Sequence, residues 1–281
     1  MSTFTEPFSA ASGDPFWVGL VDDAATFPPG DAPLDAALTA YADRAGPAAR
    51  LVRSLVVRDT DLPQVPAGTP VSVVLTGGAG QVHGPAQLCQ RRGLPVAGLE
   101  IALRDVDDPA GNARRVVAAV DAARGEGVLD EDTPVFVELP AVDPAYSWLA
   151  AADEVAAAEL RLKLRTGGLD PDAFPTPERL AAWIDAALDR ELPFKCTAGL
   201  HRALPHVDAD GCAHHGFLTL LAATRVAFDG GSPADVVSTL RRGDATDLLT
   251  LDLAGARRWF TSFGSCSIDE PLADLRELVS L

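Results

Sequence analysis

The chain has 281 residues, of which 47% are hydrophobic, and a formal net charge of −17. Because nucleic acids and anionic membranes bind basic faces, this acidity argues against both as partners. No apolar run is long enough to span a membrane, and Met1–Glu6 lacks the basic and apolar segments of a secretory signal. Four cysteines without CxxC spacing predict reduced thiols, so we expect a cytoplasmic protein.

Short apolar or β-branched segments alternate with amphipathic segments along the chain. Eight strands are predicted, at 16–21, 51–57, 70–75, 97–103, 134–138, 159–164, 193–197 and 259–264. Helices are predicted between them, at 33–45, 85–92, 109–124, 146–156, 176–189, 213–228, 233–241 and 269–280. The segment 58–69 is rich in Pro and Asp and is predicted to be a loop.

Eight strands that alternate with helices over about 250 residues are typical of a (β/α)8 barrel. We therefore predict one α/β domain, a TIM barrel over residues 1–281, with an open doubly wound sheet as the alternative. Neither a GxGxxG motif after the first strand nor a GxxxxGK[ST] motif occurs. The sequence therefore gives no support for a dinucleotide site or a P-loop.

Polar residues lie at the predicted C-terminal ends of the strands, where barrel enzymes place their active sites. Glu100 and Glu138 lie inside apolar strands. An unpaired glutamate in a barrel interior would cost several kcal/mol, so we expect both to contact the lysines described next. Asp22 follows the first strand, where an aspartate either caps a helix or contacts substrate.

Only two lysines, Lys163 and Lys195, accompany 21 arginines. Both lie in predicted strands that are consecutive, so a barrel places them side by side. Repulsion between two ammonium groups and burial would both lower the pKa of one lysine, which converts it into a nucleophile for a carbonyl compound. The structural alternative is that each lysine simply pairs with a carboxylate, and the residues leave open which lysine is the nucleophile.

Histidines are concentrated after the seventh predicted strand, at His201, His206, His214 and His215. Their spacing matches no strong zinc signature, so neither a metal nor another cofactor is expected. His201 is the candidate for proton transfer or substrate contact.

Three segments resemble the deoxyribose-phosphate aldolase family of class I aldolase barrels, over roughly residues 97–281. They are Lys163-Leu164-Arg165-Thr166-Gly167, Phe194-Lys195-Cys196-Thr197-Ala198-Gly199-Leu200 and Phe263-Gly264-Ser265-Cys266-Ser267. In that family a K-x-x-T-G strand holds the Schiff-base lysine, a second lysine precedes Gly-Gly-Ile on the next strand, and a late Gly-[AT]-Ser-Ser turn holds phosphate. The resemblance implies that Lys163 forms the Schiff base and that Lys195 lowers its pKa. It also makes Glu100, with Asp105 behind it, the nearest candidate for the family's essential acid.

The chain departs from that family in several places. Ala198-Gly199-Leu200 replaces Gly-Gly-Ile, Arg165 stands where the family has a small residue, and segment 201–216 and the N-terminal third have no counterpart. The stretches 22–29 and 194–201 are instead similar to a group of uncharacterised bacterial proteins. We therefore expect a different substrate or a different reaction on the same scaffold.

The sequence thus predicts an aldolase-type carbon–carbon lyase that acts on a small carbonyl substrate. This substrate is either unsubstituted or has a phosphate or carboxylate group. Because barrels often bind phosphate between the loops after strands seven and eight, the turn 264–267 and the loop at Gly199 are the expected anion site. The residues predicted to contact substrate are Arg165, Thr166, Gly167, Thr197, Gly199, Gly264, Ser265, Ser267 and Asp22.

Two other functions remain open at this point. In the first, an isomerase or a metal-dependent hydrolase or lyase uses the lysines only to bind an anionic substrate. In the second, the barrel binds a small molecule without catalysis. A homo-oligomer is compatible with either function and with the lyase.

Overall fold

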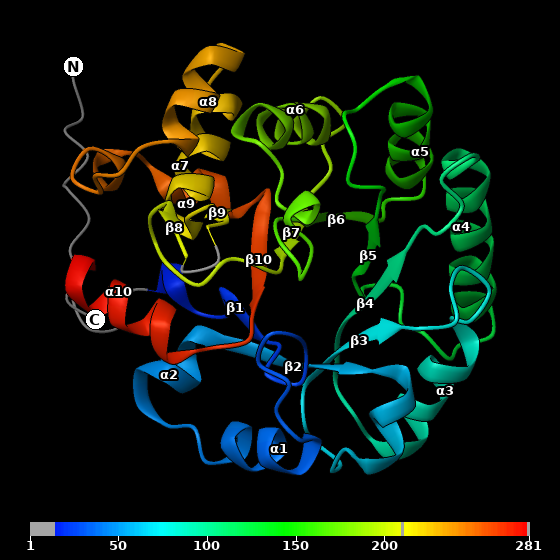
Figure 1. Ribbon diagram of the computed structural model, residues 1–281. Helices are drawn as coiled ribbons and strands as arrows, with labels where there is room; N and C mark the ends of the chain where they lie inside the picture. The colour runs from blue at the N-terminus through cyan, green and yellow to red at the C-terminus, as the bar shows by residue number, and fades with distance from the viewer. Residues whose placement is uncertain (1–14, 209–210, 280–281) are drawn as a thin grey trace, which may run out of the picture.

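The computed structural model describes residues 15–208 and 211–279. Eight parallel strands close into a barrel in the order β1-β10-β7-β6-β5-β4-β3-β2 (Figure 1). They are β1 (Val21–Asp23), β2 (Val52–Arg58), β3 (Val71–Leu75), β4 (Val96–Ala102), β5 (Val135–Glu138), β6 (Arg161–Arg165), β7 (Phe194–Thr197) and β10 (Phe260–Ser265). The prediction of a single (β/α)8 TIM barrel is therefore confirmed.

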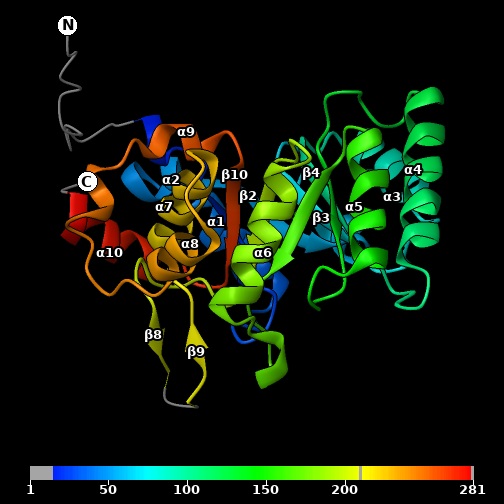
Figure 2. The ribbon, with the colours of Figure 1, turned by 90° about the horizontal axis from the view of Figure 1, so that it is seen from above.

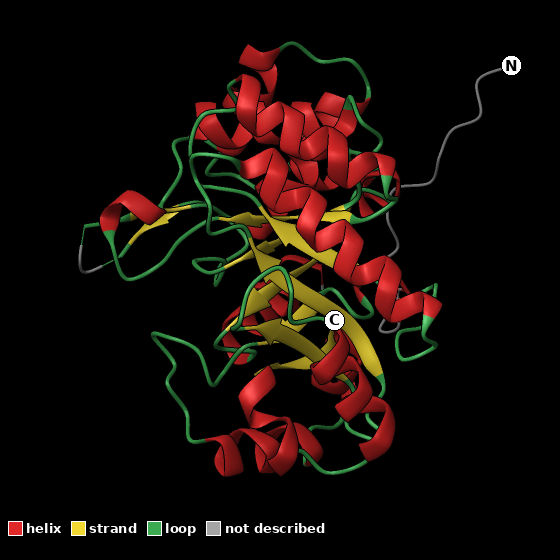
Figure 3. Ribbon diagram, turned by 90° about the vertical axis from the view of Figure 1, so that its right-hand side faces the viewer, coloured by secondary structure: helices red, strands yellow, loops and turns green. Residues whose placement is uncertain are grey.

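Helices surround the barrel and cover the outer face of its wall (Figure 3). They are α1 (Leu34–Ala42), α2 (Gly46–Leu51), α3 (His83–Arg92), α4 (Pro109–Gly125), α5 (Tyr146–Ala157), α6 (Pro177–Leu188), α7 (Phe217–Phe228), α8 (Pro233–Leu240), α9 (Leu253–Arg257) and α10 (Asp269–Val279). None of the helices in the described part of the chain is long and apolar enough to cross a membrane.

Local sequence signals explain where several helices begin. Asp108 precedes α4 and its side chain accepts a hydrogen bond from the Gly111 amide at 2.8 Å. Thr176 caps α6 in the same way, with Pro177 at the first helical position. A side-chain oxygen satisfies an amide that has no partner within the helix, and proline at this position gives up no hydrogen bond.

The structure corrects three of the predicted elements. The first strand is Val21–Asp23 rather than 16–21, because Pro15–Trp17 form a 3-10 turn and Gly19 adopts a left-handed φ of 63°. The segment predicted as a loop after β2 contains a 3-10 helix at Asp59–Gln64. The helix predicted over 213–228 begins only at Phe217. The last predicted helical residue, at 280, lies outside the described residues, as do Met1–Glu6.

The reason for the late start of α7 is a small hairpin that the sequence did not indicate. Strand β8 (His206–Val207) pairs antiparallel with β9 (Ala213–His214). The hairpin follows β7 and projects away from the body of the molecule at one end of the barrel (Figure 2). Loops that follow barrel strands lie at the C-terminal face, so the hairpin borders the face where barrel enzymes bind substrate.

Alternation along the strands separates two environments. Leu99 and Leu162 are fully buried and belong to the apolar core of the protein. Their neighbours Glu100 and Lys163 must point to the opposite face of the sheet, which is the barrel interior. Polar side chains are therefore enclosed where many barrels are filled with branched apolar residues.

Candidate active site

The two lysines are adjacent in the barrel wall, as predicted. The register of β6 and β7 pairs Lys163 with Lys195, and the register of β5 and β6 pairs Glu138 with Lys163. Lys163 is 5% exposed and Lys195 is 1% exposed. Because a buried ammonium group needs a counter-charge, the carboxylates around the two lysines determine their chemistry.

Glu100 lies between the two ammonium groups. Its carboxylate oxygens are 2.7 Å from the Lys163 Nζ and 2.6 Å from the Lys195 Nζ. Glu138 lies 3.0 Å from the Lys163 Nζ and accepts a hydrogen bond from the Arg165 Nε at 2.7 Å. The predicted contacts of both glutamates with the lysine pair are confirmed, and the charges alternate along a single buried network.

Asp22 ends this network on the side of β1. The Lys195 Nζ donates to its Oδ2 at 2.5 Å, and the Arg53 Nε donates to its Oδ1 at 3.0 Å. The hydroxyls of Ser54 and Ser262 also donate to the carboxylate, at 2.7 and 2.8 Å. Burial alone would raise the pKa of Asp22, but Lys195 and Arg53 outweigh it and hold the pKa well below its usual range.

The same balance sets the protonation of the central groups. Burial would raise the pKa of Glu100, yet Lys163 and Lys195 lower this pKa to about 2. Burial would lower the pKa of Lys163, yet the carboxylates of Glu100 and Glu138 raise it above its ordinary value. The carboxylates thus hold the pKa of Lys163 above rather than below its ordinary value, and the expected influence of Lys195 on this pKa stays a prediction.

A cavity of about 520 Å³ opens at the C-terminal face of the barrel above this network. Lys163, Glu100 and Glu138 line the cavity, whereas Lys195 and Asp22 do not. The Lys195 Nζ instead lies 5.4 Å from the centroid of the Phe136 ring, inside the barrel. Lys163 is therefore the lysine that a molecule in the cavity can contact.

Basic and apolar side chains form the rest of the cavity wall. Arg104 and Arg165 both line it. Apolar contacts come from Phe27, Leu169 and the Pro28–Pro29 pair. A small compound with an anionic group would find two guanidinium groups near the Lys163 ammonium.

His201 lines the cavity on its other side. Its Nδ1 lies 2.9 Å from the Glu270 carboxylate, and its Nε2 lies 3.6 Å from the Cys266 Sγ. Burial raises the pKa of the Cys266 thiol, so this sulfur is largely protonated near neutral pH. His201 thus lines the cavity, and its role in proton transfer or substrate contact stays a prediction.

Some of the predicted substrate residues reach the cavity and others do not. Arg165, Thr197, Gly199 and Gly264 line it, and Ser267 lines an adjoining outer cavity of about 700 Å³. Whether the turn 264–267 binds an anion stays a prediction.

Four other predicted contact residues, Thr166, Gly167, Ser265 and Asp22, do not line the lysine cavity. The Thr166 hydroxyl donates to the Ala198 carbonyl at 2.6 Å, and the Ser265 hydroxyl donates to the Ser267 carbonyl at 2.6 Å. Gly167 packs so tightly that an added Cβ would lie 2.9 Å from the Gly199 Cα. The fourth is Asp22, whose carboxylate is fully buried against Lys195 and cannot reach the cavity.

The structure also separates the two candidates for the acidic residue. Asp105 pairs with Arg115 at 3.1 Å on the protein surface, whereas Glu100 contacts both lysines. Glu100 is therefore the candidate that lies beside the lysines, and its correspondence to the family's essential acid stays a prediction.

Sequence reasoning missed the polar residues that support Asp22. Ser54, Ser72 and Ser262 are fully buried, and the hydroxyls of Ser54 and Ser72 are 2.7 Å apart. Their signal was available, since each serine lies inside an apolar strand at an inward position. Sequence reasoning also missed Arg104, which follows the fourth strand and lines the cavity.

No protein-family model matches the chain, and no curated protein matches its sequence.

Proposed function

We propose that the protein is an aldolase-type lyase in which Lys163 forms a Schiff base with a small carbonyl compound. One observation carries the proposal: Lys163 lines the cavity with a carboxylate on either side, while the second lysine is enclosed beneath. A nucleophile must be accessible, and a group that takes its proton must lie within hydrogen-bond distance. Lys163 and Glu138 meet both requirements.

The chemistry balances with these residues alone. The Lys163 ammonium passes a proton to Glu138, and the neutral amine adds to the carbonyl carbon to give a carbinolamine. The returned proton then helps the carbinolamine oxygen to leave as water, which leaves an iminium ion. In the cleavage direction, the iminium accepts the electron pair of the breaking carbon–carbon bond and becomes an enamine, while the β-hydroxyl of the substrate becomes a carbonyl and gives its proton to Glu138. Return of this proton to the enamine carbon restores the iminium, and water then releases the second product and Lys163.

The carboxylates that raise the lysine pKa suit this intermediate. An iminium has the same charge as the ammonium and forms at the same nitrogen, so Glu100 and Glu138 stabilise both. Lys195 keeps Glu100 ionised, because its Nζ lies 2.6 Å from that carboxylate. Arg104 and Arg165 favour a substrate that has a carboxylate or phosphate group.

Reduction with borohydride in the presence of small aldehydes and ketones tests the proposal. We expect a covalent adduct of one substrate mass per chain, located at Lys163 by peptide mapping. Lys163→Arg should form no adduct, whereas Lys195→Arg, which keeps the buried charge, should still form one. Absence of any adduct in the wild-type protein, or an adduct located only at Lys195, would contradict the proposal.

A second function is favoured by the raised pKa of Lys163, because an ammonium group binds anions without reacting. In this case the protein would bind a small carboxylate or phosphate ester reversibly. Saturable binding of such compounds, together with failure of borohydride to trap any carbonyl compound, would select this alternative.

A further inference from the structure

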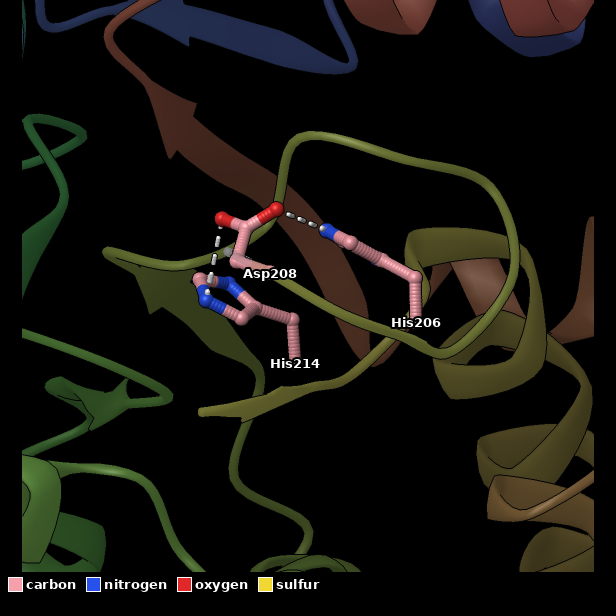
Figure 4. Close-up of side chains that lie close together, drawn as sticks. All are labelled: His206, Asp208 and His214. Carbon is pink, nitrogen blue, oxygen red and sulfur yellow. Dashed lines mark ion pairs between the residues drawn. The ribbon is translucent and has the colours of Figure 1, made fainter. Parts of the chain in front are cut away.

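The β8–β9 hairpin brings together three side chains that the proposed reaction does not use. His206 and His214 are direct cross-strand partners, and their ring centroids are 4.9 Å apart. Asp208 follows His206 by two residues and turns its carboxylate between the two rings (Figure 4). The Asp208 oxygens lie 3.6 Å from the His206 Nε2 and 3.3 Å from the His214 Nε2.

The other ring nitrogens indicate which tautomers are present. The Nδ1 of His214 lies 3.1 Å from the Gly199 carbonyl oxygen, and the Nδ1 of His206 lies 3.4 Å from the Leu204 carbonyl oxygen. Because a carbonyl oxygen only accepts hydrogen bonds, each Nδ1 carries the proton. In the neutral form of each ring, Nε2 is then the unprotonated nitrogen, and it faces Asp208. This is the arrangement in which histidines bind metal ions, with a backbone acceptor that orients the ring.

The two Nε2 atoms and the Asp208 carboxylate all face one another with lone pairs, so they need a metal cation or an additional proton between them. The need is greatest at His214, which is only 8% exposed and whose Nε2 has no hydrogen-bond partner. All three ligand atoms lie within 4.8 Å of one another. Tetrahedral zinc with bonds of about 2.0–2.1 Å needs ligand separations of roughly 3.3 Å, so small rotations would complete the site.

We propose that His206, Asp208 and His214 bind one Zn²⁺ or a similar divalent transition metal ion. Two imidazoles and a carboxylate are borderline ligands suited to such ions rather than to Ca²⁺ or Mg²⁺. Three protein ligands leave a fourth position for water or a substrate atom.

The site has a definite relation to the lysine cavity. All three residues line the outer cavity of about 700 Å³, which shares Gly199 and His201 with the cavity above Lys163. The metal ion would therefore be positioned at the rim of the mouth and would hold the hairpin against the loop at Gly199. The inference does not depend on the Schiff base.

Metal titration of the untagged, full-length protein tests this inference. After treatment with a chelator, calorimetry with Zn²⁺ should show one site per chain, and Co²⁺ should give the visible absorption of tetrahedral coordination. His214→Ala and Asp208→Asn should each weaken Zn²⁺ binding by about 100-fold or more, since even residues that only orient a ligand contribute 10–100-fold. The control is His83→Gln, because His83 also pairs with a carboxylate, Glu126, at 2.8 Å, but on the helical surface.

Two outcomes would overturn the inference. One is the absence of saturable Zn²⁺ binding to the wild-type protein. The other is equal affinity in the wild-type protein and in folded His214→Ala, with folding verified by circular dichroism. In either case an imidazolium–carboxylate pair would account for the cluster.

Discussion

The substitution Glu100→Gln examines the centre of the buried charge network. Glutamine has nearly the volume of glutamate, so packing is conserved while the negative charge between Lys163 and Lys195 is removed. Lys163 and Lys195 lower the pKa of Glu100 from 4.5 to about 2, so the ionised carboxylate stabilises the folded state. Removal of one partner of a buried ion pair typically costs about 3–5 kcal/mol. We expect the free energy of unfolding at pH 7 to fall by that amount, as when one partner of a buried ion pair is removed.

The sign of the pH dependence follows from the direction of the shift. Glu100 has a lowered pKa in the folded state, so its stabilisation is complete above about pH 4.5 and is lost as the pH falls towards about 2. The variant lacks this contribution. The stability difference between wild type and Glu100→Gln should therefore narrow as the pH is lowered from 4.5 towards 3.

Urea unfolding at several pH values measures both quantities, with Glu178→Gln as control because Glu178 is exposed and pairs with Arg241 on the surface. The control should change the stability much less. Loss of Glu100 should also lower the pKa of Lys163, so the pH optimum for borohydride trapping should move to lower pH. A stability difference under about 1 kcal/mol at pH 7, or one that does not narrow in acid, would refute the assigned charges.

Three further substitutions test other parts of the site. Lys195→Leu leaves the buried carboxylates of Asp22 and Glu100 without their shared cation, so urea unfolding should show a loss of about 3–5 kcal/mol in stability. Stability close to that of the wild type would mean that this network is not ionised. Glu138→Gln removes the proposed proton acceptor of Lys163 and should slow borohydride trapping of the carbonyl compound by about 10²–10⁴-fold, with little change in its binding affinity. An unchanged trapping rate would exclude Glu138 as the proton acceptor. Gly199→Ala should lower the free energy of unfolding by about 1–3 kcal/mol and lower the midpoint of thermal unfolding, because Gly199 has a φ of 74° and an added Cβ would lie 3.0 Å from the Thr166 carbonyl oxygen. An unchanged midpoint would contradict this.

The sequence alone was sufficient for the fold and for part of the site. Eight apolar segments separated by amphipathic ones predicted the barrel, and the predicted helix 176–189 agrees with α6, which begins at the Thr176–Pro177 pair. These signals are local, since they depend on periodicity and on backbone chemistry within a few residues. Lys163 and Lys195 could be predicted as neighbours because consecutive strands of a barrel pair with one another.

Weak local signals account for the errors in the fold. Strand β1 has only three residues, and the apolar residues before it form a turn instead. The hairpin strands have two residues each, so no periodicity could reveal them. The convergence of His206, Asp208 and His214 was therefore also beyond sequence reasoning.

Only the tertiary structure determined which carboxylates surround each lysine and which lysine is accessible. Asp22 and Lys195 are 173 positions apart in the chain, yet their side chains are 2.5 Å apart in the barrel. A pKa depends on burial and on distances of a few ångströms, and neither follows from residue spacing. The sequence could therefore identify Lys163 as unusual, but only the folded barrel places it at the cavity beside the carboxylates that raise its pKa.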